Sequence, residues 1–225
     1  MQDGAVKTIG EPGNARSRRT RAALLDATRS LLEEHGFESL TMGAVAERAG
    51  VSRRAVYLHF DSRAALVTAL FEHVARTEGL QDSLRPIWQA DDAVTALDEW
   101  ARHLARYHPR VIAVDRAVER VRHTDRDAAQ HWERVVEAQL SSCRRLATWL
   151  DHEDRLAPPW TVDSAADMLW ALISTDMIQG LLRDRAWSRT RLAEHLGLLF
   201  RSTFTRDRRP GDPGGRGRAT PLSHL

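Results

Sequence analysis

Lysine is almost missing from this chain: of its 33 lysine and arginine residues, only Lys7 is a lysine. Cysteine is equally scarce, since Cys143 alone excludes an intrachain disulfide and any zinc site made of several cysteines. We expect Cys143 to lie in the core, because it falls on an apolar helical stripe. No apolar run approaches the roughly 20 residues that cross a bilayer, and residues 1–11 lack the apolar segment of a secretory signal. We therefore expect a soluble, cytoplasmic protein.

Motifs of catalysis are also missing. The sequence has no glycine-rich phosphate loop, no His-Glu-x-x-His and no Gly-x-Ser-x-Gly. Its ten histidines include no pair four residues apart, the spacing that places two ligands on one helix face. We expect neither an enzyme nor a metal or other cofactor.

One sign of charge does not dominate, because the formal net charge is only +2. The balance is nevertheless uneven along the chain. Residues 16–63 hold nine arginines and six acidic residues, a net charge of +3, whereas residues 64–200 carry −4 and residues 201–225 carry +4. All seven tryptophans follow residue 80. A small basic module followed by a larger, tryptophan-rich acidic one suggests two separate tasks.

Helical periodicity runs through the chain, and alternating strand patterns are scarce. The sequence predicts an all-α protein of about nine helices. Pro109 is expected in the first turn of a new helix, and residues 165–182, apolar nearly all round, are expected to form one helix buried on most sides. We predict four parts: a flexible arm (1–15), a three-helix helix-turn-helix DNA-binding domain (16–63), a helical ligand-binding and dimerisation domain (64–204), and a disordered basic tail (205–225).

The segment between Leu40 and Phe60 carries the clearest motif. Thr41 suits the N-cap of one short helix and Ser52 that of the next, while Gly50 suits the tight turn between them. Ala46, Ala49 and Val51 supply small or apolar side chains where the two helices cross, and Val56 and Phe60 are expected to face inward. This combination predicts a helix-turn-helix rather than an ordinary helical hairpin.

Arg53, Arg54, Tyr57 and His59 fall on the outer face of the second helix. A helix of this size fits the major groove of B-DNA, where arginine pairs bidentately with guanine. Tyrosine and histidine reach phosphate oxygens and fix the register of the protein on the duplex.

Residues 20–70 resemble the DNA-binding domain of the tetracycline-repressor (TetR) family of bacterial transcription regulators. The resemblance rests on Gly36-Phe37, on the turn from Ala46 to Ser52, and on Tyr57-Leu58-His59-Phe60 followed by Ser62-Arg63 and Leu66. A further likeness is Arg185-Ala186-Trp187-Ser188 before the last helix, where the family commonly has Arg-Gly-Trp-Ser.

The resemblance implies roles for eight residues of the domain. Thr41, Tyr57, His59 and Arg63 would hold phosphates, and Ser52, Arg53, Arg54 and Leu58 would face bases. Two positions depart from the usual pattern, because Arg54 stands where a small residue is common and Arg63 where a lysine is usual. Arg18, Arg19 and Arg21 could add backbone contacts, or could belong to a solvated arm.

The resemblance also implies that the last two long helices pair with those of a second copy. The apolar stretch and the last helical stripe nominate an interface of Leu169, Leu172, Ile173, Leu192, Leu196, Leu199 and Phe200, although some of these side chains could equally pack inside one subunit. Aromatic and polar side chains in apolar helical segments nominate a ligand site, with core packing again the alternative: Trp100, His103, Tyr107, Trp132, Gln139, Trp149, Met168, Trp170 and Asp176.

The sequence therefore predicts a dimeric repressor that binds a palindromic DNA operator and leaves it when an unknown small-molecule effector binds. No membrane partner is expected. Two alternatives remain open at this point: a DNA-binding activator, and a protein that binds or sequesters a small molecule and has a vestigial helix-turn-helix.

Overall fold

The computed structural model describes residues 14–207. Within that range the chain is helical, and its one β feature is an isolated bridge between Leu156 and Thr205. The predicted all-α fold is confirmed for this part of the chain. It contains ten α-helices rather than about nine: α1 Ala15–His35, α2 Met42–Arg48, α3 Arg53–Tyr57, α4 Arg63–Thr77, α5 Leu80–Trp88, α6 Ala93–Val121, α7 Arg126–His152, α8 Val162–Ala171, α9 Thr175–Gln179 and α10 Arg189–Phe204. A short 3₁₀ helix (η1, Phe37–Ser39) and a π-helical turn (η2, Gly180–Asp184) complete it.

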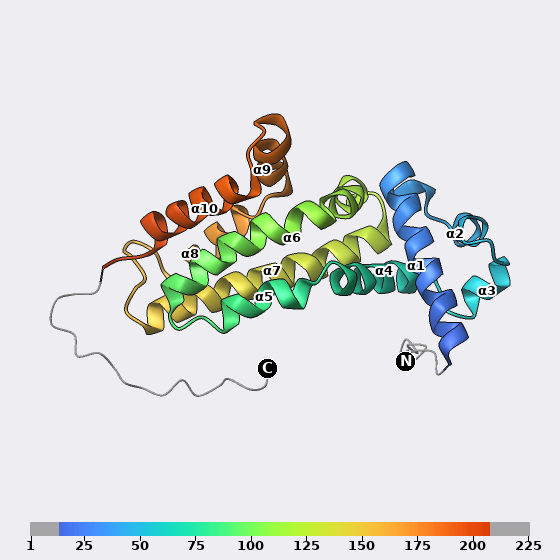
Figure 1. Cartoon of the computed structure of the whole chain (residues 1–225), viewed down its shortest axis with the longest axis horizontal. Coiled ribbons are helices and arrows are strands. Elements are labelled where there is room, and N and C mark those ends of the chain that lie inside the picture. The colour runs from blue at the N-terminus through green and yellow to red at the C-terminus, as the bar shows by residue number, and fades with distance from the viewer. Residues whose placement is uncertain (1–13, 208–225) are drawn as a thin grey trace.

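The molecule is elongated, with α1 to α3 at one end and the long helices α6 and α7 running side by side behind them (Figure 1). We call residues 14–60 the head and residues 80–204 the body; α4 joins the two. The last helix, α10, packs along α6, and α8 packs along α7. Both lie toward the end of the body opposite the head (Figure 1).

Both predicted terminal segments are shorter than expected where the structure describes them. Asn14 caps α1 by accepting a hydrogen bond from the backbone N–H of Ser17, and Ala15 is already helical. Thr205 forms the bridge with Leu156, and the N–H of Arg206 donates to the carbonyl of Arg155 at 2.9 Å. The remainder of the predicted arm (1–13) and tail (208–225) lies outside the described residues.

Two clusters of buried apolar side chains hold the fold together. One joins the head and α4 to the second half of α6, through residues such as Leu31, Val56, Leu70 and Val118. The other fills the body between the first half of α6 and helices α5, α7, α8 and α10. Cys143 is fully buried in this second cluster, as expected, and burial raises the pKa of its thiol to about 12. The first cluster crosses the predicted domain boundary at residue 63.

The helix α6 corrects the expectation that a new helix begins at Pro109. Ala93 to Val121 form one continuous helix with Pro109 in its interior. An interior proline lacks the N–H that would bond to the preceding turn and costs about 3 kcal/mol. Here the helix continues because it buries an apolar stripe on both sides of the proline, including Leu97 and Leu104 before it and Val114 and Val118 after it.

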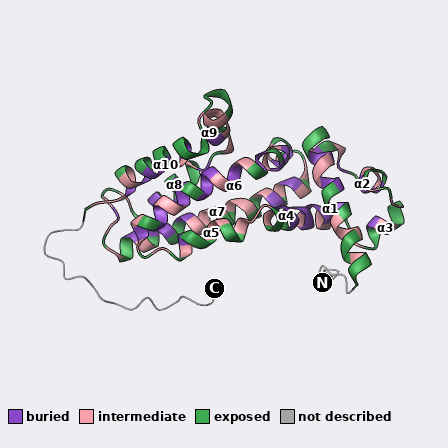
Figure 2. Ribbon diagram, viewed as in Figure 1, coloured by how far each residue is buried: buried purple, intermediate pink, exposed green. Residues whose placement is uncertain are grey.

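The apolar stretch 165–182 is likewise not one buried helix. It breaks after Ala171, and Ser174 begins the new helix α9 by accepting a hydrogen bond from the N–H of Met177. The sequence Ser174-Thr175-Asp176 is a typical helix start, which the apolar residues around it concealed. Several residues of α8 are exposed (Figure 2).

Within residues 14–207, no helix has both the length and the apolar character that crossing a membrane requires.

Three histidines are buried with lowered pKa values. Burial lowers the pKa of His103 to about 3, of His108 to about 4 and of His131 to about 4, with smaller contributions from positive neighbours at His103 and His131. The opposite shift occurs at Asp115, whose pKa burial and the nearby Glu119 raise to about 7. All four groups are therefore held mainly in their neutral forms at mildly acidic pH.

We expect the free energy of unfolding to fall by about 2–3 kcal/mol from pH 6 to pH 5. A lowered histidine pKa contributes stability that is present above 6.5 and is lost as the pH falls, because the unfolded chain takes up the protons. Three histidines act in this direction, and Asp115, which is protonated only in the folded state over this range, offsets one of them. Urea titrations at several pH values measure the slope.

The variant His103→Gln should reduce this drop by about 1.4 kcal/mol per pH unit, the contribution of one proton. A free energy of unfolding that stays constant between pH 6 and pH 5 would contradict the neutral burial of these groups.

Candidate nucleic-acid interface

The predicted helix-turn-helix is present and is built by its caps. The hydroxyl of Thr41 accepts a hydrogen bond from the N–H of Ala44 at 3.1 Å, and that of Ser52 accepts one from the N–H of Ala55 at 3.2 Å. Gly50 has a φ of 66°, the left-handed conformation that a turn of this kind requires. The sequence at these positions therefore fixes where α2 ends and where α3 begins.

The inner face of α3 anchors it to the head. Val56 is fully buried and Phe60 is 2% exposed, and both pack with Val45 and Ala46 of α2 in the first core cluster. The N–H of Val51 donates to the carbonyl of Ala46 at 2.9 Å and closes the turn. A five-residue helix has little stability of its own, so this packing sets the direction in which its outer face points.

The outer face of α3 carries the four predicted base-facing residues to solvent. Arg53 and Arg54 are exposed, as are Ser52 and Leu58, the last with 67% of its surface accessible. Tyr57 is 43% exposed, and the guanidinium of Arg53 lies 5.8 Å from its ring. No acidic residue occurs between Ala49 and Phe60. The outer face of α3, a helix at this end of the molecule (Figure 1), thus presents cations, an aromatic hydroxyl and an apolar side chain to solvent.

His59 and the start of α1 lie beside this face. Burial and the nearby positive charge of Arg21 lower the pKa of His59, so its imidazole is neutral at pH 7. The guanidinium of Arg21 also stacks over the ring of Phe60 at 4.9 Å. Of the three arginines named at the start of α1, Arg21 therefore lies against the residues that follow α3, and the residues Arg18 and Arg19 are exposed.

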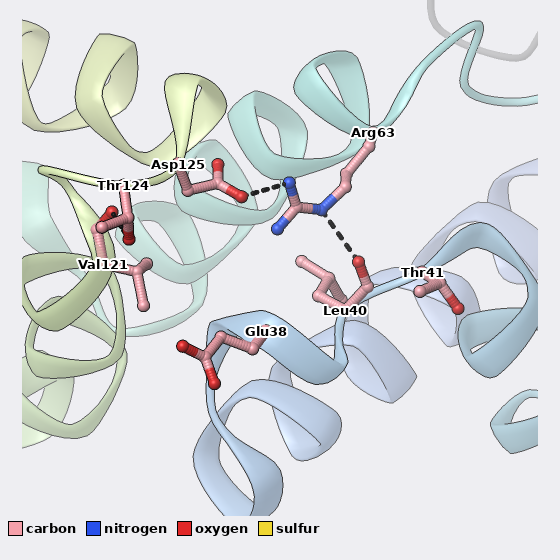
Figure 3. Close-up of a pocket in the computed structure, with 7 residues that line it drawn as sticks. All are labelled: Glu38, Leu40, Thr41, Arg63, Val121, Thr124 and Asp125. Atoms are coloured by element: carbon pink, nitrogen blue, oxygen red, sulfur yellow. Dashed lines mark hydrogen bonds and ion pairs between the residues drawn. The ribbon is translucent and has the colours of Figure 1, made fainter.

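Arg63 differs from its expected role at a phosphate, because the structure turns it inward. Its guanidinium bonds to Asp125 at 2.7 Å and to Asp127 at 3.4 Å, donates to the carbonyls of Leu40 (2.8 Å) and Phe37 (3.2 Å), and stacks over the ring of Phe37. It sits in a cleft of about 430 Å³ between the head and the start of α7 (Figure 3). Arg63 therefore connects the head to the body, and its donors are used within the protein.

Asp125 is shaped for this contact as well as for capping α7. Its other oxygen accepts hydrogen bonds from the N–H groups of Asp127 and Ala128. Burial would raise the pKa of Asp125, but the bonds from Arg63 and from the backbone outweigh it and hold the pKa below the ordinary value. The carboxylate is consequently charged throughout the neutral range and available to pair with Arg63.

Of the nine predicted ligand residues, the structure brings three together on α6. The rings of Trp100 and His103 lie 5.3 Å apart, and His103 stacks on Tyr107 at 5.5 Å. Nδ1 of His103 lies 2.9 Å from the hydroxyl of Ser83, and Nε1 of Trp100 is buried with no hydrogen-bond partner among the described residues. These side chains are packed into the body, so they form a buried polar patch.

The other six residues do not join that patch. Met168 and Trp170 are 41% and 36% exposed on α8, and the carboxylate of Asp176 pairs at the surface with Arg116 at 2.5 Å. These three residues lie at the surface, and their part in a ligand site stays a prediction. Trp132 packs on the first core cluster, under the guanidinium of Arg122. Trp149 packs on the second cluster, and Gln139 is half-buried on α7. Trp132 and Trp149 are therefore core residues. Helical periodicity alone cannot distinguish an aromatic side chain in the core from one in the wall of a ligand pocket.

Most of the predicted dimer interface is packed inside the single chain. Five of its residues are at most 4% exposed and pack in the chain's own core, so their contact with a second copy stays a prediction: Leu169, Ile173, Leu192, Leu196 and Phe200. Leu172 is half-buried against the same core, and Leu199 is 39% exposed. The predicted stripe faces α6 and α7, and a neighbouring residue that the prediction missed, Leu198, is 59% exposed. The one sequence signal for it is the doubled Leu198-Leu199, which puts apolar side chains on two faces of α10.

The site and fold define a helix-turn-helix protein with a helical body, and comparison with known proteins agrees. Residues 24–70 match the family described as bacterial regulatory proteins, tetR family. The chain is 35% identical over 75 residues to the transcriptional regulator TtgR of Pseudomonas putida, covering 30% of this chain and 36% of that protein. It is 36% identical over 83 residues to the transcriptional repressor KstR of Mycolicibacterium smegmatis, covering 36% and 41%. The matched segment thus spans well under half of these curated relatives.

Over its whole length, the chain resembles known structures only at the level of the fold. The crystal structure of NalD, described as the secondary repressor of the MexAB-OprM multidrug efflux pump in Pseudomonas aeruginosa, superposes with a TM-score of 0.68 at 24% identity. That match covers 86% of this chain and all of NalD. The head of this chain therefore resembles the DNA-binding domain of the TetR family, and the matched relatives carry the names of transcriptional regulators.

We expect Arg63→Gln to lower the free energy of unfolding by about 1–3 kcal/mol, because it leaves two carboxylates and two carbonyls without their charged donor. Urea unfolding at pH 7 measures this effect. The control is Arg54→Gln, an exposed arginine of the same head, which should change stability by no more than about 0.5 kcal/mol.

A double-mutant cycle with Asp125→Asn, which keeps the capping oxygen of α7, isolates the ion pair. An Arg63→Gln variant as stable as Arg54→Gln would show that this contact does not fasten the head to the body.

Proposed function

We propose that this protein is a dimeric, sequence-specific repressor that reads a palindromic operator with α3 and is released by a small-molecule ligand. The observation that carries the proposal is the outer face of α3, where Arg53 and Arg54 stand exposed beside Tyr57 on a helix fixed from behind by Val56. Exposed guanidiniums on a helix of this kind can pair with O6 and N7 of guanine in the major groove. The names of the matched relatives support regulation of transcription by this domain.

The charge of the head supports DNA rather than an acidic protein as its partner. The guanidiniums of Arg53 and Arg54 belong to α3 itself, and Arg21 of α1 lies next to His59 at its end. Thr41 and Ser52 use their hydroxyl oxygens to cap helices, and each hydroxyl keeps a proton that can donate to a phosphate. Cations and hydroxyl donors along one edge match the phosphate backbone on either side of a groove.

A second copy is proposed to bind the outer side of α8 and α10. Leu198 and Leu199 are exposed on α10, and Met168 and Trp170 are exposed on α8. These are four of the six large apolar side chains that remain exposed in the described chain, and the other two, Tyr57 and Leu58, lie on α3. Both helices lie away from the head (Figure 1), so a two-fold axis there would leave α3 of each copy free to meet successive grooves about 34–36 Å apart.

Selection of bound duplexes from a random pool should yield a palindromic sequence, and the affinity for it should fall steeply with added salt. Within this site, Arg53→Ala should cost about 1–3 kcal/mol on the selected sequence and relax the preference at one base pair. Tyr57→Phe should weaken binding about equally on selected and scrambled duplexes, because it removes a phosphate contact.

The control for these variants is Arg85→Ala, since Arg85 is an exposed arginine on α5 of the body. It should leave both affinities unchanged. A protein that recovers no preferred duplex from the pool would refute sequence-specific binding, and Arg53→Ala with equal losses on both duplexes would remove Arg53 from base recognition.

For the dimer, we expect the double variant Leu198→Glu/Leu199→Glu to sediment as a monomer while the unchanged protein sediments as a dimer. Two carboxylates buried in an apolar interface would cost more than the interface supplies. Leu58→Glu, which puts the same charge on an exposed leucine of α3, is the matched control and should remain dimeric. A dimer that survives the double variant places the interface on another surface.

A further inference from the structure

A second cavity lies in the body, away from the cleft at Arg63. It has a volume of about 360 Å³, within the range of small-molecule sites, and opens between the middle of α6, the turn η2 and the start of α10. None of the nine predicted ligand residues lines it. Its walls combine apolar surface from Pro109, Ile112, Leu182 and Trp187 with polar groups of Gln179, Arg183, Ser188 and Arg189.

One polar group in this wall has no hydrogen-bond partner among the described residues. Oε1 of Gln179 is buried, yet nothing in the described chain donates to it. A buried carbonyl oxygen without a donor costs about 1–3 kcal/mol. This oxygen is closed off from solvent although Gln179 lines the cavity, so a rotation of the side chain would bring it within reach of a donor on a bound molecule. A hydroxyl group on a bound molecule has the required chemistry.

The charge of the wall is positive. Arg183 and Arg189 both line the cavity, and no acidic residue does. The two nearest acids in the sequence are turned elsewhere or not part of the wall: Asp176 pairs with Arg116, and Asp184 lies on η2 beside Gly180. These arginines therefore favour a ligand that carries negative charge.

The start of α10 adds to this preference. Ser188 caps a helix of 16 residues whose first turn contains no acidic side chain. The N-terminus of such a helix carries a partial positive charge and unpaired N–H groups, which favour an anion. Here it faces the same cavity as the two arginines.

The backbone around the cavity is irregular in two places. Residues 180–184 form a π-helical turn, and Ala186 has a φ of 52°, a left-handed conformation that alanine rarely adopts. Both features occur preferentially at functional sites, where the surrounding structure holds them in place. The N–H of Trp187 donates to the carbonyl of Leu181 at 2.9 Å, which holds its backbone against the turn, and its indole packs beside Arg191 and His195 of α10.

We propose that this cavity binds an amphiphilic carboxylate bearing a hydroxyl group. Arg183, Arg189 and the start of α10 hold the carboxylate. The apolar body of the ligand packs against Trp187, Ile112 and Leu182, and its hydroxyl donates to Oε1 of Gln179. A carboxylate, an apolar body and a hydroxyl are the three groups that these lining residues favour.

The position of the cavity on α6 lets a bound ligand influence the head. Ile112 belongs to α6, and the following residues of that helix, Val114 and Val118, pack in the core that the head shares. A ligand that prefers one arrangement of α6 would shift the population of head positions. This regulatory role rests on the proposed function, whereas binding itself does not.

The probe for binding is 6-hydroxy-2-naphthoate, titrated into the full chain in a calorimeter without DNA. Two relatives of the probe test its groups separately: 2-naphthoate lacks the hydroxyl, and 2-naphthol lacks the carboxylate. We expect saturable binding of one molecule per chain, with the hydroxynaphthoate tightest and 2-naphthol weakest.

Three arginine variants locate the site. Arg183→Gln and Arg189→Gln should each weaken the hydroxynaphthoate about tenfold, the effect of one lost charged hydrogen bond. Arg185→Gln is the matched control, because Arg185 is exposed in the same segment but does not line the cavity, and it should bind like the unchanged protein.

Three results would overturn the proposal: no saturable heat with the carboxylates, binding of 2-naphthol as tight as that of the acids, or affinities that neither cavity arginine changes. Duplex selection with the same preparation separates this failure from that of the repressor. Selective DNA binding without naphthoate binding removes the site and keeps the repressor, and the reverse outcome keeps the site and removes the repressor.

Discussion

One helix supports both halves of this molecule. The apolar stripe of α6 enters the core of the body with Leu97 and Leu104 and the core of the head with Val114 and Val118. Each buried side chain of this kind contributes about 1.5–3 kcal/mol, so neither core survives without its share of α6. Head and body are therefore not two independent domains joined by a linker. The relative position of head and body therefore depends on the direction and straightness of α6.

The apolar stripe of α6 holds the head and the body together, and Arg63 fixes the angle between them. Apolar packing is insensitive to small rotations, whereas an arginine that bonds to two carbonyls of the head and two carboxylates of α7 fixes an angle. The same side chain leaves the head without a cation at the place where the family resemblance expects one. The cationic surface of the head is instead concentrated at α3 and the start of α1. These two segments are therefore the part of the chain best suited to contact a DNA duplex.

The head could be predicted from sequence because its determinants are local. Thr41, Gly50 and Ser52 each act within three or four residues, and Val56 and Phe60 follow from helical spacing. The partners of Arg63 lie 62 and 64 residues away, and no local pattern announces them.

In the body, periodicity showed which face of α10 is buried but not what covers it. The same spacing fits packing within one chain and packing against a second copy, and the structure buries Leu192, Leu196 and Phe200 within one chain. The cavity at Gln179 was missed for a similar reason, because it depends on a break at Ser174 and a π-helical turn that an apolar sequence conceals.

The position of Pro109 in α6 affects how easily that helix bends. It removes one hydrogen bond from α6 where the two cores meet, so the helix bends there more easily than elsewhere, and it also lines the cavity beside Ile112. The twelve residue-to-residue steps from Pro109 to Val121 make a lever of about 18 Å. A bend of about 5° at its pivot displaces the far end by about 1.5 Å, because displacement is arm length times angle. In this geometry, the stiffness of the helical turn at Pro109 determines how far a small bend of α6 in the body displaces the end of that helix beside the head.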